Sequence, residues 1–248
     1  MNTALALAIG LVALLYASVG HAGATGYIAV MTLFGVAPEV IRPTALVLNV
    51  LVATIATVQF ARAGHFRGPL FWRLAATSVP CAIVGGAMRL PTGTFEKLVG
   101  IVLAISAVRL LGNAWPATNP PRQAPHGTEP PGTPLLTALG GGIGLLSGLT
   151  GVGGGVFLTP ALLALQAAPV KQIAALTAPF ILVNSLAGLA GGVIAGRSLP
   201  PISLLVIAAA MLGGAIGAHL GAFRLPVRAL QFLMACVLAI ASLKLFGL

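Results

Sequence analysis

The chain has 248 residues, of which 58% are hydrophobic and only 6% are charged, and its mean hydropathy is +1.06. A soluble domain of this length cannot bury so much apolar surface, so the composition excludes an ordinary soluble protein and indicates membrane-spanning helices. The formal charge of +10 does not indicate a nucleic-acid partner. The basic residues stand singly between apolar runs, as is typical of loops that face anionic lipid headgroups.

Ten apolar runs follow one another, and a proline-rich linker at 113–134 separates the first five from the last five. The N-terminal repeat, 1–112, is predicted to hold a hairpin at about 3–36 and spans at about 43–62, 69–89 and 95–111. The C-terminal repeat, 135–248, is predicted to hold a hairpin at about 135–166 and spans at about 173–195, 201–222 and 228–246. The first apolar run lacks a basic n-region and continues into membrane-like sequence, so we expect it to be retained rather than cleaved as a signal peptide.

The first two runs of each half are short and meet at glycine. Crossing the hydrocarbon takes about 20 residues, so we predict that each pair dips into the membrane as a re-entrant hairpin, which three full spans then follow. An odd number of crossings in each half requires the second half to be inverted. The expected fold class is therefore an all-α integral membrane protein of two inverted homologous repeats.

Sequence matches between the halves support a duplication. They share one offset of 135 residues: Gly86–Pro91 with Gly221–Pro226, Val102–Ile105 with Val237–Ile240, and Asn49 with Asn184. On the inverted topology, eight Lys and Arg residues gather on one side and five on the other. The richer side is then cytoplasmic, and both termini are periplasmic. If each hairpin region crossed once instead, the division would be seven against six.

Glycine-rich hairpin turns are the candidate binding site. Gly153, Gly154 and Gly155 stand directly before an apolar run, so they place a bare helix N-terminus near mid-membrane. Such an end binds anions without a charged side chain, and the missing Cβ atoms let a ligand approach the backbone. Inversion would bring the two turns together around one small anion. The corresponding residues of the first turn are Gly23, Thr25 and Gly26.

The alternative for any of these glycines is close helix packing, which we prefer elsewhere in the chain. The glycines expected to pack helices are Gly85, Gly86, Gly191, Gly192, Gly213 and Gly214.

Polar residues inside the apolar runs are the other candidates. Asn49 and Asn184 are suited either to bind an anion or to hold their helix against a hairpin. His21 is suited to a structural hydrogen bond or to a coupling proton. Hydroxyl donors, which more often bond to their own helix, are Ser147, Thr150, Ser185 and Thr25. Arg42 and Lys171 are near the hairpin mouths and are expected to contact headgroups.

Carboxylates are scarce. The chain has no Asp, and its three Glu residues, Glu39, Glu96 and Glu129, flank helices or lie in the linker. A carboxylate cation site is therefore disfavoured, and no metal-ligand spacing or nucleophile–base set is present. We expect no enzyme activity, no cofactor and no metal.

The glycine motif resembles the TauE/SafE sulfite exporters. The resemblance rests on Ser147–Gly155 followed by Pro160, on Lys171–Ser185, and on the two-half organisation, and it covers essentially the whole chain. The first half departs from it, with Gly-His-Ala-Gly-Ala-Thr-Gly in place of a near-complete glycine run. The resemblance implies transport of sulfite or an organosulfonate, usually outward across a bacterial inner membrane.

The leading hypothesis is a transporter of a small anion that works by alternating access, with the lipid bilayer as its environment and a second copy of the chain as a candidate partner. Coupling to a proton is favoured over sodium, and facilitated diffusion is equally compatible. The alternatives are an anion channel and a membrane accessory subunit of a sulfur-metabolising system.

Overall fold

The protein is described from a computed structural model. The structure describes residues 2–88 except 65 and 67, scattered positions between 91 and 108, and residues 132–223 except 166 and 169. Its helices are α1 Asn2–Ala17, α2 Ala24–Leu33, α3 Pro38–Arg62, α4 Gly68–Ala87, α6 Thr133–Thr150, α7 Gly155–Ala164, α8 Val170–Ile194 and α9 Leu204–Phe223. The predicted span at 228–246, most of that at 95–111 and most of the linker lie outside the described residues.

The described part of the chain is all helical, which confirms the all-α part of the predicted class. Five of its helices, α3, α4, α6, α8 and α9, are long and apolar enough to cross a membrane. The helices α1, α2 and α7 have 16, 10 and 10 residues and are shorter. α6, the first arm of the second predicted hairpin, has 18 residues and so is long enough to count among the five.

Two helix pairs pack through glycine seams. Glycines four residues apart share one helix face, and a Cβ on any of them would collide with the backbone of the facing helix. On α9 the seam is Gly213, Gly217 and Gly221, which face Gly10 and Leu14 of α1 and Ser18 directly after it. On α6 it is Gly140, Gly144 and Gly148, which face Leu74, Ser78 and Ala82 of α4. In both pairs the contacts advance together along the chain, so the two helices run parallel.

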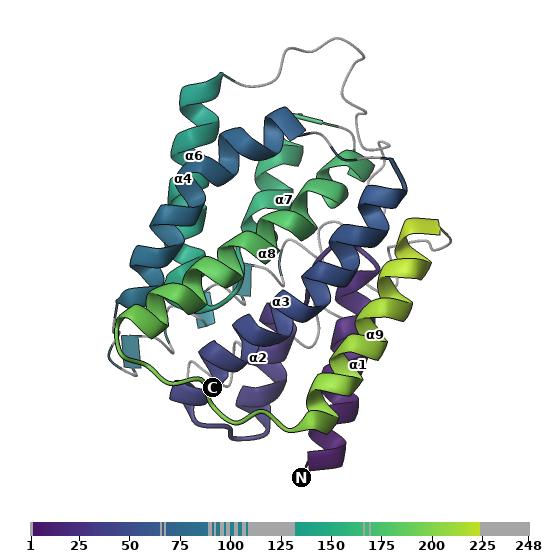
Figure 1. Ribbon diagram of the computed structural model, residues 1–248, viewed down its shortest axis with the longest axis vertical. Coiled ribbons are helices and arrows are strands. Elements are labelled where there is room, and N and C mark those ends of the chain that lie inside the picture. The colour runs from purple at the N-terminus through teal and green to yellow at the C-terminus, as the bar shows by residue number, and fades with distance from the viewer. Residues whose placement is uncertain are drawn as a thin grey trace.

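The two pairs run in opposite directions. In Figure 1, α1 and α9 both run upward, whereas α4 and α6 both run downward. α3 runs upward and α8, its counterpart in the other half, runs downward. The first helix of each predicted hairpin, α1 or α6, thus packs on a span of the other half, whereas α2 and α7 pack on α3 and α8 of their own halves.

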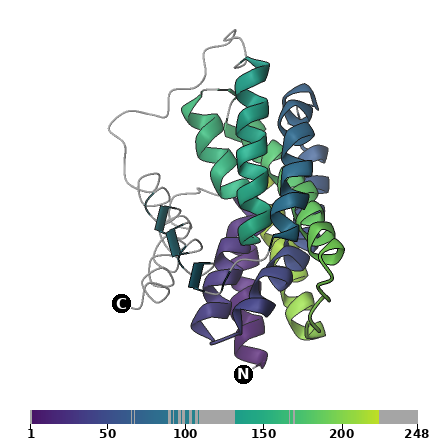
Figure 2. The ribbon, with the colours of Figure 1, turned by 90° about the vertical axis from the view of Figure 1, so that its left-hand side faces the viewer.

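The two helix pairs α1–α2 and α6–α7 approach each other from opposite ends. In Figures 1 and 2, α1 and α2 occupy the lower half of the molecule and α6 and α7 the upper half. Both turns contain glycines with positive φ, including Gly23 at +105° and Gly153 at +79°. Residues 18–23 and 151–155 are buried or half-buried, so both turns lie inside the protein.

Candidate functional site

The turn between α6 and α7, which we call the second tip, is residues 151–155. Gly151, Gly153 and Gly154 have φ values of +78°, +79° and +82°, a region that only glycine enters readily. Among the described hydrogen bonds, none uses the N–H of Gly153, Gly154, Gly155 or Val156. The sequence thus folds here into a run of free backbone donors at the N-terminus of α7, where the helix dipole is positive.

Side chains from two long helices surround this tip. Asn49 of α3 points its Nδ2 at the carbonyl oxygen of Val152, 3.4 Å away, and at Ser185 Oγ of α8, 3.3 Å away. Both side chains are buried. The Oδ1 of Asn49 and the Oγ of Ser147 are also buried and have no partner among the described residues. The second tip therefore combines free backbone donors with one free hydroxyl, that of Ser147, and one free acceptor, Asn49 Oδ1.

Thr150 and Asn184 are engaged elsewhere. Thr150 Oγ1 donates to the Leu146 carbonyl at 2.7 Å, within its own helix. Asn184 Nδ2 donates to the Phe180 carbonyl at 2.8 Å, while its Oδ1 accepts from Ser78 Oγ at 2.6 Å. Asn184 thus holds α8 to α4, and the structure does not bring it to the second tip with Asn49.

The turn between α1 and α2, the first tip, is covered by tyrosines. Tyr27 is fully buried, and its ring lies where a Cβ on Gly23 would be. Its hydroxyl donates to the Ala22 carbonyl at 2.6 Å. Thr25 donates to the Tyr16 hydroxyl at 2.9 Å, and a Cβ on Gly26 would meet the side chains of Val12 and Tyr16. Sequence reasoning missed both tyrosines, although they are the chain's only two and flank this tip.

His21 joins the two tips. Its Nε2 lies 3.2 Å from the Gly155 carbonyl oxygen and 3.2 Å from Thr159 Oγ1, and its Nδ1 lies 3.2 Å from the Val19 carbonyl oxygen. Thr159 in turn lies 3.0 Å from Thr177 Oγ1 on α8. A continuous polar chain therefore runs from the first tip through α7 to α8. Sequence reasoning did not place Thr159 in this chain.

Arg42 is buried against the ends of two helices, where the sequence predicted a residue at the membrane surface in contact with headgroups. Its side chain is only 8% exposed and donates to the carbonyl oxygens of Gly85, Gly86, Gly148 and Met88. These oxygens belong to the C-terminal ends of α4 and α6, where helix dipoles favour a cation. The stem of Arg42 also lies against the second tip, because a Cβ on Gly151 would be 2.9 Å from Arg42 Cγ. The side chain of Lys171 is outside the described set.

Comparison with known proteins decides the family. The family profile described as "Sulfite exporter TauE/SafE" matches residues 5–245. The chain belongs to this family. The chain is also similar to "Probable membrane transporter protein y4hK" of Sinorhizobium fredii (strain NBRC 101917 / NGR234), to which it is 38% identical over 97% of this chain and 96% of the relative. No solved structure matches the chain.

Membership of the TauE/SafE family confirms the resemblance seen in the sequence and makes this chain a multi-pass membrane transporter. The family profile spans both tips and both glycine seams. For this TauE/SafE protein, the free donors of the second tip, the His21 chain and Arg42 form one connected region between α3 and α8.

Proposed function

We propose that this protein carries a small anion, sulfite or an organosulfonate, across the bacterial inner membrane by alternating access. The carrying observation is the second tip, where the free N–H groups of residues 153–156 lie beside the unpartnered hydroxyl of Ser147. These groups suit an oxyanion, because backbone donors and a positive helix end stabilise negative charge without a buried counterion.

Access to this site requires movement. Residues 151–155 are buried, and a Cβ on Gly153 would already meet Asn49 and Ile181. An anion therefore enters only when a hairpin moves relative to α3 and α8. The opposed directions of the two halves support an inverted repeat, in which such a movement opens one side and closes the other. The charge difference between the two sides favours periplasmic termini.

The test of transport is uptake by the purified protein in liposomes. Sulfite, thiosulfate, sulfoacetate, sulfate and chloride are compared in wild type and Gly154→Leu, whose side chain would meet Ile143 and Phe180. We expect saturable uptake of sulfite or a sulfonate, stimulated by counterflow, and its loss in the variant. Large unitary conductance would instead indicate a channel, and no uptake by the chain alone would indicate an accessory subunit.

Alanine substitutions of Asn49 and Asn184 are expected to have different effects, although the two residues occupy matching positions in the two halves. Asn49→Ala removes the Nδ2 donor that lies against Gly153 at the second tip, so we expect KM for the anion to rise about tenfold, the value of one hydrogen bond to a charged group. Asn184→Ala leaves the Ser78 hydroxyl without its buried acceptor, so we expect a lower melting temperature with little change in KM. Uptake kinetics and thermal melting are measured on both variants. A KM of Asn49→Ala equal to that of the wild type would place Asn49 outside the site.

We also propose that His21 carries a coupling proton. Both of its ring nitrogens face carbonyl oxygens, and only the imidazolium form donates from both. No charged side chain among the described residues contacts the ring. Uptake in wild type should therefore respond to an imposed pH gradient. In His21→Gln we expect that response to vanish while anion exchange without a gradient persists. A wild type indifferent to the gradient would leave His21 a structural residue.

A further inference from the structure

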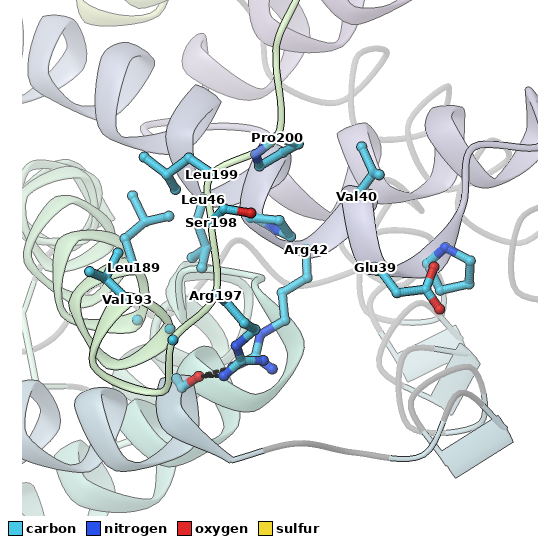
Figure 3. A pocket seen from close by; sticks show the side chains of 16 residues that line it. Glu39, Val40, Arg42, Leu46, Leu189, Val193, Arg197, Ser198, Leu199 and Pro200 are labelled. Atoms are coloured by element: carbon cyan, nitrogen blue, oxygen red, sulfur yellow. Dashed lines mark hydrogen bonds between the residues drawn. The ribbon is translucent and has the colours of Figure 1, made fainter.

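A cavity of about 590 Å³ opens between the start of α3, the ends of α4 and α8, and the segment that joins α8 to α9. Its charged and polar lining residues are Glu39, Arg42, Arg197 and Ser198, and Figure 3 shows them around the space. Gly86, Gly188 and Gly192 also line it and leave backbone bare at its wall. The size suits a small ligand.

Two arginines meet at the wall of this cavity. Arg42 donates to the Gly86 carbonyl at 2.9 Å and to the Met88 carbonyl at 3.3 Å. Arg197 donates to the same two oxygens. Figure 3 shows the two guanidinium groups next to each other. The two adjacent positive charges repel each other, and the carbonyl oxygens that they share at the end of α4 hold the two guanidinium groups in place.

Among the described residues that line the cavity, positive charge exceeds negative charge. Glu39 is the one carboxylate among the lining residues, and no ion pair joins it to Arg42 in the described structure. In Figure 3 its carboxylate lies apart from the two guanidinium groups. An anion between the arginines would relieve their repulsion and receive planar, paired N–H donors.

We propose that this cavity is a second anion site, a vestibule that binds a small oxyanion through Arg42 and Arg197 before or after it occupies the second tip. Its assignment to the transported anion rests on the proposed function. The binding chemistry is also that of an anionic lipid headgroup, so the experiment must separate these two sources.

The vestibule connects to the second tip along one face of α3. Leu46, one turn after Arg42, lines the cavity, and Asn49 lies two turns after Arg42. Seven residues of helix rise by roughly 10 Å, so the two sites are close but separate. Arg42 contacts both, since its guanidinium lines the cavity and its stem lies against Gly151. An anion that draws Arg42 toward the cavity would therefore loosen the contact that holds the second tip.

The experiment measures charge and occupancy at one lining residue. Ser198→Cys is made in a Cys81→Ser, Cys236→Ser background, and it is modified with an anionic sulfonatoethyl or a cationic trimethylammonium-ethyl methanethiosulfonate reagent. Ser203→Cys, exposed in the same segment but outside the cavity, is the matched control. We expect the ratio of anionic to cationic rates to be about tenfold higher at residue 198. Arg197→Gln should lower the ratio toward the control, and Arg197→Lys should restore it.

Occupancy is tested by protection in phosphatidylcholine liposomes. Methanesulfonate should slow the anionic reagent at residue 198 and not at residue 203; sulfite is avoided because it attacks disulfides. Equal rate ratios at the two positions, or no protection, would overturn the proposal. Protection only by added phosphatidylglycerol would also overturn it and assign a lipid headgroup. Modification of residue 198 does not require transport. If methanesulfonate still protects residue 198 while no anion is taken up, the vestibule proposal stands and the proposed function is rejected.

Discussion

Replacing Gly153 with alanine is expected to lower anion uptake by about a hundredfold. The residue has φ +79°, and the added Cβ would lie 2.5 Å from Asn49 Nδ2 and 2.9 Å from Ile181 Cγ2. It would displace the side chain that borders the free N–H groups and fill the space that a ligand needs. Losing two charge-assisted hydrogen bonds at about 1.5 kcal/mol each corresponds to roughly that factor. Initial uptake rates in liposomes measure the effect.

Gly64→Ala is the matched control for this substitution. Gly64 has nearly the same conformation, φ +77°, but nothing lies within 4 Å of the position of its Cβ. It therefore carries the same backbone strain, about 1–2 kcal/mol, without the collision. We expect near-normal uptake per folded molecule. If Gly153→Ala transports as well as Gly64→Ala, the second tip does not bind the anion.

The fold class and the glycine tips could be predicted from the sequence because both depend on local properties. Hydropathy and length identify membrane helices wherever they pack. A glycine run before an apolar segment predicted a turn that leads into a bare helix N-terminus, and in that turn Gly151, Gly153 and Gly154 have positive φ. The first residue of α3 could not be predicted as well. Hydropathy places the start of the span at Pro43, whereas the helix begins at Pro38 and includes Pro43.

The environment of single polar residues could not be predicted, because it depends on other helices. Arg42 interrupts an apolar run, and the sequence does not show that the ends of α4 and α6 supply its carbonyl partners. The two asparagines differ for a related reason. Asn184 bonds to Ser78, but the position 135 residues after Ser78 is Gly213, which offers Asn49 no hydroxyl. The first repeat therefore leaves Asn49 available to the second tip.

Substitution of a glycine in the seam between α4 and α6 should destabilise the protein far more than substitution of a glycine elsewhere in α6. A Cβ on Gly144 would collide with the backbone of Ser78, and no rotamer change relieves a clash with backbone. Gly144→Val therefore requires the two helices to separate, and we expect a loss of about 3 kcal/mol in stability. Thermal melting of the purified protein measures it.

Gly142→Val is the control for the seam, because Gly142 lies in the same helix with nothing within 4 Å of its Cβ position. Both substitutions add the same side chain to α6, so their difference reports the contact with α4 alone. If the two proteins melt at the same temperature, α4 and α6 do not pack through this seam. A destabilised Gly144→Val beside a folded but inactive Gly153→Ala would separate the glycines that pack helices from those that face the anion.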